Sequence, residues 1–115
     1  MKRREEVDLP EHVRRVLDRI VEEAKKLGRL EAVILFGSWA KREAGEESDV
    51  DVLVVADVRS RLRAAGRLMA AVYDIQVPVD VVVYRPGEWR ERKRLVGMMP
   101  YEAARDGVLW YGSAA

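Results

Sequence analysis

The chain has 115 residues, of which 49% are hydrophobic and 36% charged, and its 21 basic and 20 acidic residues leave a formal net charge of +1. We expect one globular domain over residues 1–115, with a frayed stretch at residues 1–7. No apolar run reaches the ~18 residues of a membrane helix, so we expect a cytoplasmic protein. The balanced charge does not favour a nucleic-acid partner, and the absence of cysteine excludes disulfides and thiol chemistry.

A helix is predicted first, over residues 9–27. Asp8 has the position of an N-cap, Pro10 lies in the first turn, and Glu11 is placed as a capping-box partner. Gly28 follows as the residue that ends the helix. The apolar residues recur at helical spacing: Val13, Val16, Leu17, Ile20, Val21, Ala24 and Leu27.

An apolar run at residues 30–36 predicts a buried strand, which ends abruptly at Gly37 and Ser38. A short helix is predicted over residues 38–42, followed by a loop at 44–48. Gly37 permits close approach of the backbone to an anion, and free N–H groups at the start of a helix would point toward a phosphate.

A second strand is predicted at residues 50–56, and two carboxylates, Asp49 and Asp51, stand at its beginning. Side chains two apart on a strand project from the same face, so both can reach one metal site. Asp is unfavourable in strands, and hard oxygen ligands are the ones that Mg²⁺ prefers. The pair therefore favours a magnesium site over its alternatives, which are solvation of a loop end and capping of a turn.

Ser60 is predicted to cap a helix, and a third strand follows at residues 79–84 with Asp80 inside it. A lone carboxylate in a buried strand is costly unless it is paired or bound to a metal. The alternatives are an Asp that faces water or one that pairs with an Arg. The rest of the chain is predicted as two helices and a short strand, at residues 88–95, 100–105 and 108–111.

The sequence Gly37-Ser38 after one strand, Asp49-x-Asp51 on the next and Asp80 on a third together resemble the signature of the DNA polymerase beta-like nucleotidyltransferase superfamily. The small size resembles its minimal branch, the MNT or MntA-like proteins. The resemblance extends over about residues 9–112. It implies an α+β fold, in which a small mixed sheet has its helices packed mainly on one face.

The resemblance also implies roles for the three acids. In the family, the residues that match Asp49 and Asp51 hold two Mg²⁺ ions that bridge the nucleoside triphosphate. The residue that matches Asp80 completes the second metal site and helps to deprotonate the attacking hydroxyl. We therefore expect all three to be catalytic and to bind metal.

The turn residues are expected to bind nucleotide by the same resemblance. Gly37 and Ser38 match the cradle of the β- and γ-phosphates. Lys41 falls where many relatives have Arg, and either contacts the triphosphate or is a solvated lysine. Arg42 replaces a Gly that is common in relatives, and Trp39 stands where a Tyr or Arg is often seen. These departures leave open the shape of the following loop and the choice of substrate.

The implied reaction is Mg²⁺-dependent transfer of a nucleoside monophosphate, first of all AMP from ATP, to a hydroxyl group. Stand-alone proteins of this branch resemble the antitoxin of a toxin–antitoxin pair, which adds AMP to a tyrosine of a separate HEPN-domain toxin. One alternative is nucleotidylation of a small molecule, as in aminoglycoside-modifying relatives, although those carry an additional helical domain. The other is a non-catalytic module that only binds its partner, which the full set of acids disfavours. Formation of a homo-oligomer stays open.

Overall fold

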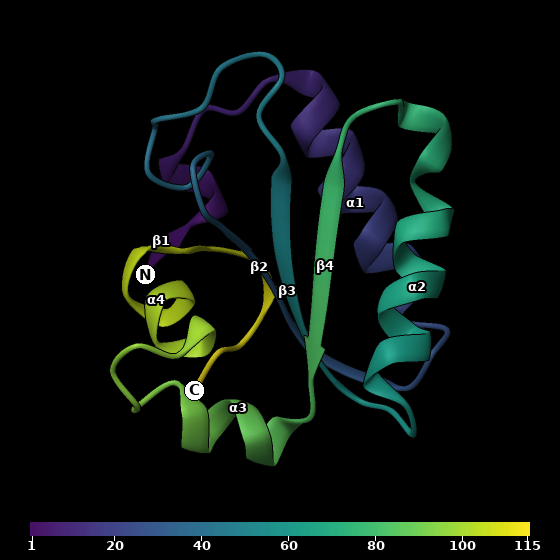
Figure 1. Ribbon diagram of the computed structural model, residues 1–115, viewed down its shortest axis with the longest axis vertical. Helices are drawn as coiled ribbons and strands as arrows, with labels where there is room; N and C mark the ends of the chain where they lie inside the picture. Colours follow the sequence, from purple (N-terminus) through teal and green to yellow (C-terminus); the bar gives the residue numbers. More distant parts are fainter.

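A five-stranded sheet organises the molecule in the computed structural model, which describes residues 1–115 (Figure 1). Across the sheet the strands lie in the order β1 (Lys2–Arg3), β5 (Val108–Gly112), β2 (Arg29–Phe36), β3 (Val50–Asp57) and β4 (Val79–Tyr84). The β2–β3 pair is antiparallel and the β3–β4 pair is parallel. The mixed α+β sheet predicted from the sequence is confirmed, as are the three strands predicted at residues 30–36, 50–56 and 79–84, which are β2, β3 and β4.

Four helices cover the sheet, α1 and α2 on one face and α3 and α4 on the other (Figure 1). Their bounds are α1 (Glu11–Ala24), α2 (Arg61–Ala71), α3 (Pro86–Arg92) and α4 (Met99–Asp106), with two short 3₁₀ turns, η1 (Arg4–Glu6) and η2 (Tyr73–Ile75). No helix is both long enough and apolar enough to cross a membrane.

The molecule has a larger and a smaller core because alternate residues of each strand point to opposite faces. The larger core joins α1 and α2 to one face of the sheet. In the smaller core, Leu53 and Tyr84 of the opposite face pack against Trp89 of α3 and Ala103 of α4. This smaller core covers only one end of its face. Most of the buried apolar surface therefore lies under α1 and α2, although the helices divide two and two between the faces instead of packing mainly on one, as predicted, because α3 and α4 bury a second core.

The ends of α1 differ from the prediction. Pro10, in an extended conformation, is the residue before the helix and no side chain caps it, so the expected N-cap at Asp8 and capping box at Glu11 are wrong. The helix ends at Ala24 and continues as a tighter turn. Gly28 does not end it in a left-handed conformation. Its Cα packs against the backbone carbonyl of Asp57 instead, where a Cβ would collide.

The first residues are also more regular than predicted. The backbone N–H of Lys2 donates to the carbonyl of Gly107 at 3.0 Å, and β1 pairs in parallel with β5. The guanidinium of Arg4 lies 4.1 Å from the centre of the Trp110 ring. The expectation that residues 1–7 are frayed is therefore wrong, because a strand distant in the sequence holds them.

The remaining helices follow from local signals. Ser60 caps α2 as predicted, because its Oγ accepts a hydrogen bond from the N–H of Arg63 at 3.2 Å. Helix α3 begins two residues earlier than predicted, with Pro86 in its first turn, and the side chain of Glu88 accepts from the N–H of Arg85 at 3.0 Å. The strand at the C-terminal end, β5, is confirmed.

Candidate active site

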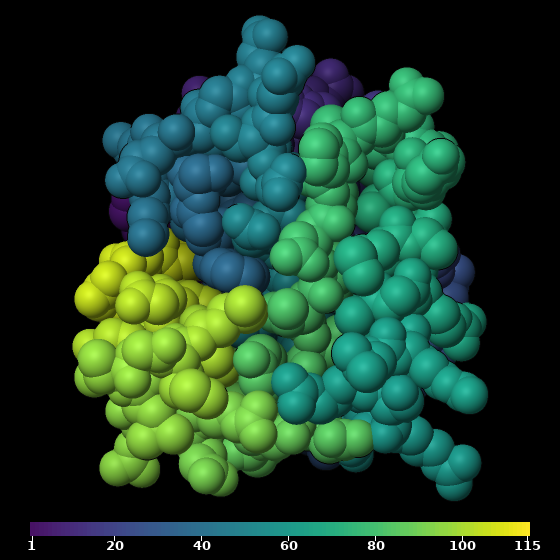
Figure 2. All heavy atoms as spheres, in the orientation of Figure 1, coloured from purple at the N-terminus to yellow at the C-terminus, as the bar shows by residue number.

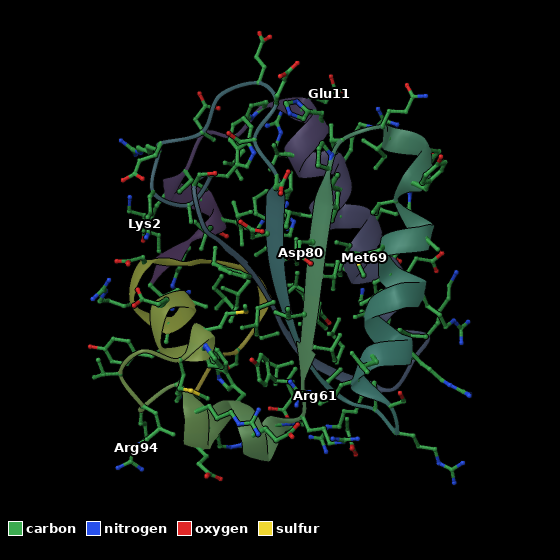
Figure 3. All side chains as sticks on the ribbon, in the orientation of Figure 1. Lys2, Glu11, Arg61, Met69, Asp80 and Arg94 are labelled. Atoms are coloured by element: carbon green, nitrogen blue, oxygen red, sulfur yellow. The ribbon has the colours of Figure 1, made fainter.

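The three acids lie at one end of the sheet, where β2 ends and β3 and β4 begin. Asp51 of β3 is the register partner of both Asp80 on β4 and Phe36 on β2. Side chains of directly paired residues share a face, so Asp51 and Asp80 are neighbours on the face that α3 and α4 cover elsewhere. Figure 3 shows Asp80 on the stretch of β4 beyond α3, where no helix crosses the sheet. The sequence-based expectation that Asp80 lies beside the Asp49 and Asp51 pair is met by this arrangement.

Gly37 brings the turn after β2 into contact with this group. Its φ is +75°, in the left-handed region that favours glycine. A Cβ at this position would collide with the carboxylate of Asp51. A close backbone approach therefore places the predicted phosphate-binding turn directly against one of the predicted metal ligands.

The carboxylates form an unneutralised patch of negative charge. Burial raises the pKa of Asp51 above its ordinary value of 3.8, and the negative charges of Asp80 and then Asp49 raise it further. None of the ion pairs in the structure involves any of the three acids. A bound cation would relieve this repulsion.

The donors fit Mg²⁺ in kind, since they are hard carboxylate oxygens beside a turn suited to phosphate. No three acidic or histidine side chains are gathered closely enough to form a ready metal cluster. Asp51 is half-buried within β3, whereas Asp49 and Asp80 are exposed. Binding of a metal would therefore require these two side chains to turn toward Asp51.

The turn itself is not the predicted helix over residues 38–42. The N–H of Lys41 donates to the carbonyl of Gly37 at 3.2 Å, and that of Glu43 to the carbonyl of Ser38 at 2.9 Å. Arg42 adopts a left-handed conformation, with φ of +61°, which interrupts a helix. No helix N-terminus therefore points toward the site from this turn. The backbone of the turn and the Ser38 hydroxyl remain as candidate phosphate donors.

Lys41 is exposed on this turn and lies near Asp106, at the end of α4. Hydrogen bonding to Arg105 holds the pKa of Asp106 below its ordinary value, and the nearby positive charge of Lys41 adds to this effect. The Lys41 side chain is therefore close enough to Asp106, at the end of α4, to lower its pKa. Its contact with a nucleotide stays a prediction.

Trp39 has a structural function that the sequence did not reveal. Its indole N–H donates to the carbonyl of Ser48 at 3.3 Å, and Ser48 directly precedes Asp49. The ring of His12, at the start of α1, meets the Trp39 ring edge-on, with centroids 5.6 Å apart and an interplanar angle of 79°. Trp39 therefore joins the two ends of the loop between β2 and β3 and anchors them to α1. No spacing rule in the sequence indicates this hydrogen bond.

Residues 17–101 match the family model for a nucleotidyltransferase domain. A curated protein of Methanocaldococcus jannaschii, named as a candidate protein adenylyltransferase, is 51% identical over 35 residues. Those residues are 30% of this chain and 35% of that protein, so the match spans about a third of the length of the relative.

Two solved structures share the fold. A candidate nucleotidyltransferase from Sulfolobus solfataricus is 27% identical, with a TM-score of 0.54 over 89% of this chain and 85% of that chain. A complex of a tri-AMPylated HEPN toxin from Shewanella oneidensis with an MNT antitoxin is 19% identical in the matched chain. Its TM-score is 0.51, over 88% of this chain and 73% of that chain, and this likeness concerns the fold alone.

Proposed function

This chain belongs to the nucleotidyltransferase domain family, and from that membership we propose that it transfers AMP from ATP to a hydroxyl group of a partner protein. One observation carries the proposal: the Gly37 turn packs against Asp51 in a group of three acids that no cation neutralises. Backbone donors for a triphosphate and ligands for its counter-ions are thus side by side.

The adenylyl group and the protein acceptor are supported by the relatives. The Methanocaldococcus protein is named as a candidate protein adenylyltransferase, and the toxin in the Shewanella complex carries AMP. We propose that the acceptor here is likewise a HEPN-domain toxin and that this chain is its antitoxin. The cytoplasm, which supplies ATP and Mg²⁺, is the compartment that we propose.

The proposed reaction forms one P–O bond and breaks another. The oxygen of the acceptor hydroxyl attacks the α-phosphorus of ATP, the bond between the α-phosphorus and the α–β bridging oxygen breaks, and pyrophosphate leaves. Asp80, on the exposed side of the group, accepts the proton of the acceptor hydroxyl. Gly37 and Ser38 bind the β- and γ-phosphates and fix the line of attack.

Asp49, Asp51 and Asp80 would hold the metal. Two Mg²⁺ ions, when bound, would neutralise the triphosphate and stabilise the charge that develops on the attacking and leaving oxygens. The protein contributes by holding Asp51 rigidly in the sheet against the Gly37 turn. Lys41 would add a point charge near the terminal phosphates if its exposed side chain turned toward them.

The test is incubation with labelled ATP and Mg²⁺, with and without the protein of the neighbouring reading frame. We expect label on the partner, lost in Asp49→Asn and in Asp80→Asn. Glu46→Gln is the matched control, because Glu46 is an exposed acid in the same loop. Tight binding of the partner without label from any nucleoside triphosphate would overturn the catalytic proposal and leave a module that acts by contact alone.

A further inference from the structure

The outer face of α2 carries an apolar stripe that nothing in the chain covers. Leu62 is 87% exposed and Tyr73, just beyond the helix, is 85% exposed. Gly66 and Met69 lie between them at helical spacing, so the four positions follow one side of the helix. In Figure 2 the side chains of α2 project from the edge of the molecule.

Gly66 is the least expected residue of this stripe. A glycine inside a helix is destabilising relative to alanine. It is exposed, and a Cβ placed on it would meet no atom within 4 Å. Neither close packing nor a left-handed φ within the molecule requires glycine here. A partner backbone lying close to α2 would require it.

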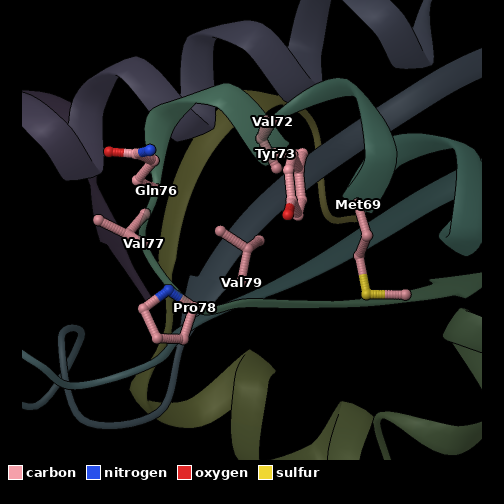
Figure 4. Close-up of a pocket in the computed structure, with 7 residues that line it drawn as sticks. All are labelled: Met69, Val72, Tyr73, Gln76, Val77, Pro78 and Val79. Carbon is pink, nitrogen blue, oxygen red and sulfur yellow. The ribbon is translucent and has the colours of Figure 1, made fainter.

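The stripe continues into a pocket between the end of α2 and the start of β4 (Figure 4). The pocket has a volume of about 410 Å³. Its lining is mostly apolar: Met69, Val72, Tyr73, Gln76, Val77, Pro78 and Val79. Val79 and Asp80 are neighbours on the edge strand β4 but point to opposite faces, so the pocket and the candidate active site lie on the two sides of the same free edge of the sheet.

The unpaired charges beside the stripe are all positive, because the one acid there, Asp74 after Tyr73, is paired with Arg19 at 2.8 Å. Arg59 precedes α2, and Arg63 and Arg67 each follow a residue of the stripe. All three are exposed and none forms an ion pair. Helix α2 contains no acidic residue. A complementary surface must therefore be apolar in the centre and acidic at its side.

We propose that the α2 stripe and the pocket form the docking surface for an amphipathic helix of the acceptor protein, with acidic residues beside its apolar face. This inference rests on the proposed function, since it assigns the surface to the acceptor of the adenylyl group. Gly66 lets the partner helix approach closely, and the pocket takes one of its apolar side chains. Docking there places the partner at the edge strand that carries Asp80.

A second copy of this chain fits the surface less well. In two copies of α2 packed antiparallel about a two-fold axis, like flanks face each other. Arg63 and Arg67 of one copy would then meet the same residues of the other, and this repulsion opposes association. The charge pattern therefore selects a different protein.

Two synthetic helical peptides test the inference with the full chain. They share one apolar stripe and carry either Glu or Lys at the flanking positions. We expect the Glu peptide to bind roughly tenfold more tightly than the Lys peptide in a fluorescence anisotropy titration. The paired change Arg63→Glu and Arg67→Glu should reverse that preference. The paired change Leu62→Ser and Tyr73→Ser should weaken both peptides, whereas Val96→Ser, an equally exposed apolar site elsewhere, should not.

Equal binding of the two peptides, or no binding of either, would overturn the inference. So would a dimer of the free chain in sedimentation that Leu62→Ser dissociates, since the occupant would then be a second copy. The titration needs neither ATP nor Mg²⁺. Charge-selective docking in a protein that labels no partner would therefore refute the proposed function and leave the docking surface standing.

Discussion

The two ends of one face of the sheet have opposite characters, although the same strands build both. At one end Leu53, Val55 and Tyr84 are buried under Trp89 and α4. At the other, Asp51 shares its face with Asp80, and no helix covers it. The alternation of side chains along β3 and β4 continues unbroken from one end to the other. Only the residue type changes, and with it the property of each end: a packed core at the covered end and, as we propose, chemistry at the open end.

The largest expected effect is a loss of activity that distinguishes the two ends of β3. Asp51→Asn should lower kcat/KM for AMP transfer by at least about 10³-fold, because a neutral amide cannot supply the charge that a metal and a triphosphate require. The matched control is Asp57→Asn, at the exposed far end of the same strand, which should leave the rate unchanged. Equal losses of kcat/KM in both variants would show that the two ends of β3 do not differ in function.

Substitutions at the covered end should lower the stability of the protein. Trp89 is 1% exposed, and Trp89→Ala should lower the free energy of unfolding by about 3–5 kcal/mol through lost burial and a new cavity. Arg90→Ala, on the exposed side of the same helix, should cost less than about 0.5 kcal/mol. Urea unfolding measures both. A loss at Trp89 no larger than at Arg90 would contradict the assignment of this end to stability.

Gly37→Ala tests the contact that joins the turn to the open end. A left-handed conformation costs a non-glycine residue about 1–2 kcal/mol, and the added Cβ would also displace the Asp51 carboxylate. We expect both a lower free energy of unfolding and weaker ATP binding by calorimetry. Gly45→Ala in the same loop meets no atom and should change neither quantity. Unaltered ATP binding in Gly37→Ala would remove the turn from the site.

The fold was predictable where the signals are local. The apolar runs that became β2, β3 and β4, and the Ser60 cap of α2, are readable without tertiary information. Pairing of β1 with β5 joins the two ends of the chain, so the sequence near Lys2 could not indicate it. The left-handed conformation of Arg42 likewise has no signal in its residue type, and the short helix predicted there was wrong.

The grouping of the candidate site residues was predictable from the sequence, but the contacts that support it were not. The spacing of Gly37, Asp49 and Asp51 between apolar runs indicated a site because few other patterns place a glycine turn and paired acids beside one sheet. The hydrogen bond from Trp39 to Ser48 depends on how the loop folds back, and the contact with His12 depends on the position of α1. Both arise from tertiary structure, which no local pattern encodes.

Trp39→Phe should therefore have a smaller effect on the candidate site at the open end than the preceding substitutions. The ring that packs on His12 is kept and the hydrogen bond to Ser48 is lost, at a cost of about 1 kcal/mol. We expect the KM for ATP to rise roughly fivefold with kcat nearly unchanged, because the loop before Asp49 is less well positioned. His12→Ala should have a smaller effect in the same direction. A fall in kcat without a change in KM would argue that Trp39 acts on the reaction itself.

The smallest effect is a dependence of stability on pH that belongs to the open end alone. Burial and the charges of Asp80 and Asp49 raise the pKa of Asp51 in the folded protein above its ordinary value of 3.8. Below that value the carboxyl is protonated in both the folded and the unfolded chain. As the pH rises through the folded pKa, the folded chain gives up a proton that it holds more tightly than the unfolded chain does. The stability supplied by that proton is then lost.

The Asp51→Asn variant has no carboxyl at this position, so it cannot lose this contribution. The difference in unfolding free energy between the variant and the natural chain should therefore grow, in favour of the variant, from about pH 4 to neutral pH and then level off. Other acids with lowered pKa values, such as Glu88, act in the opposite direction but equally in both proteins, so the difference isolates Asp51. Chemical denaturation across this pH range measures it. Millimolar Mg²⁺ should reduce the difference, because a cation at the open end replaces the proton. A difference that stays constant with pH would mean that neither burial nor the neighbouring carboxylates raise the pKa of Asp51.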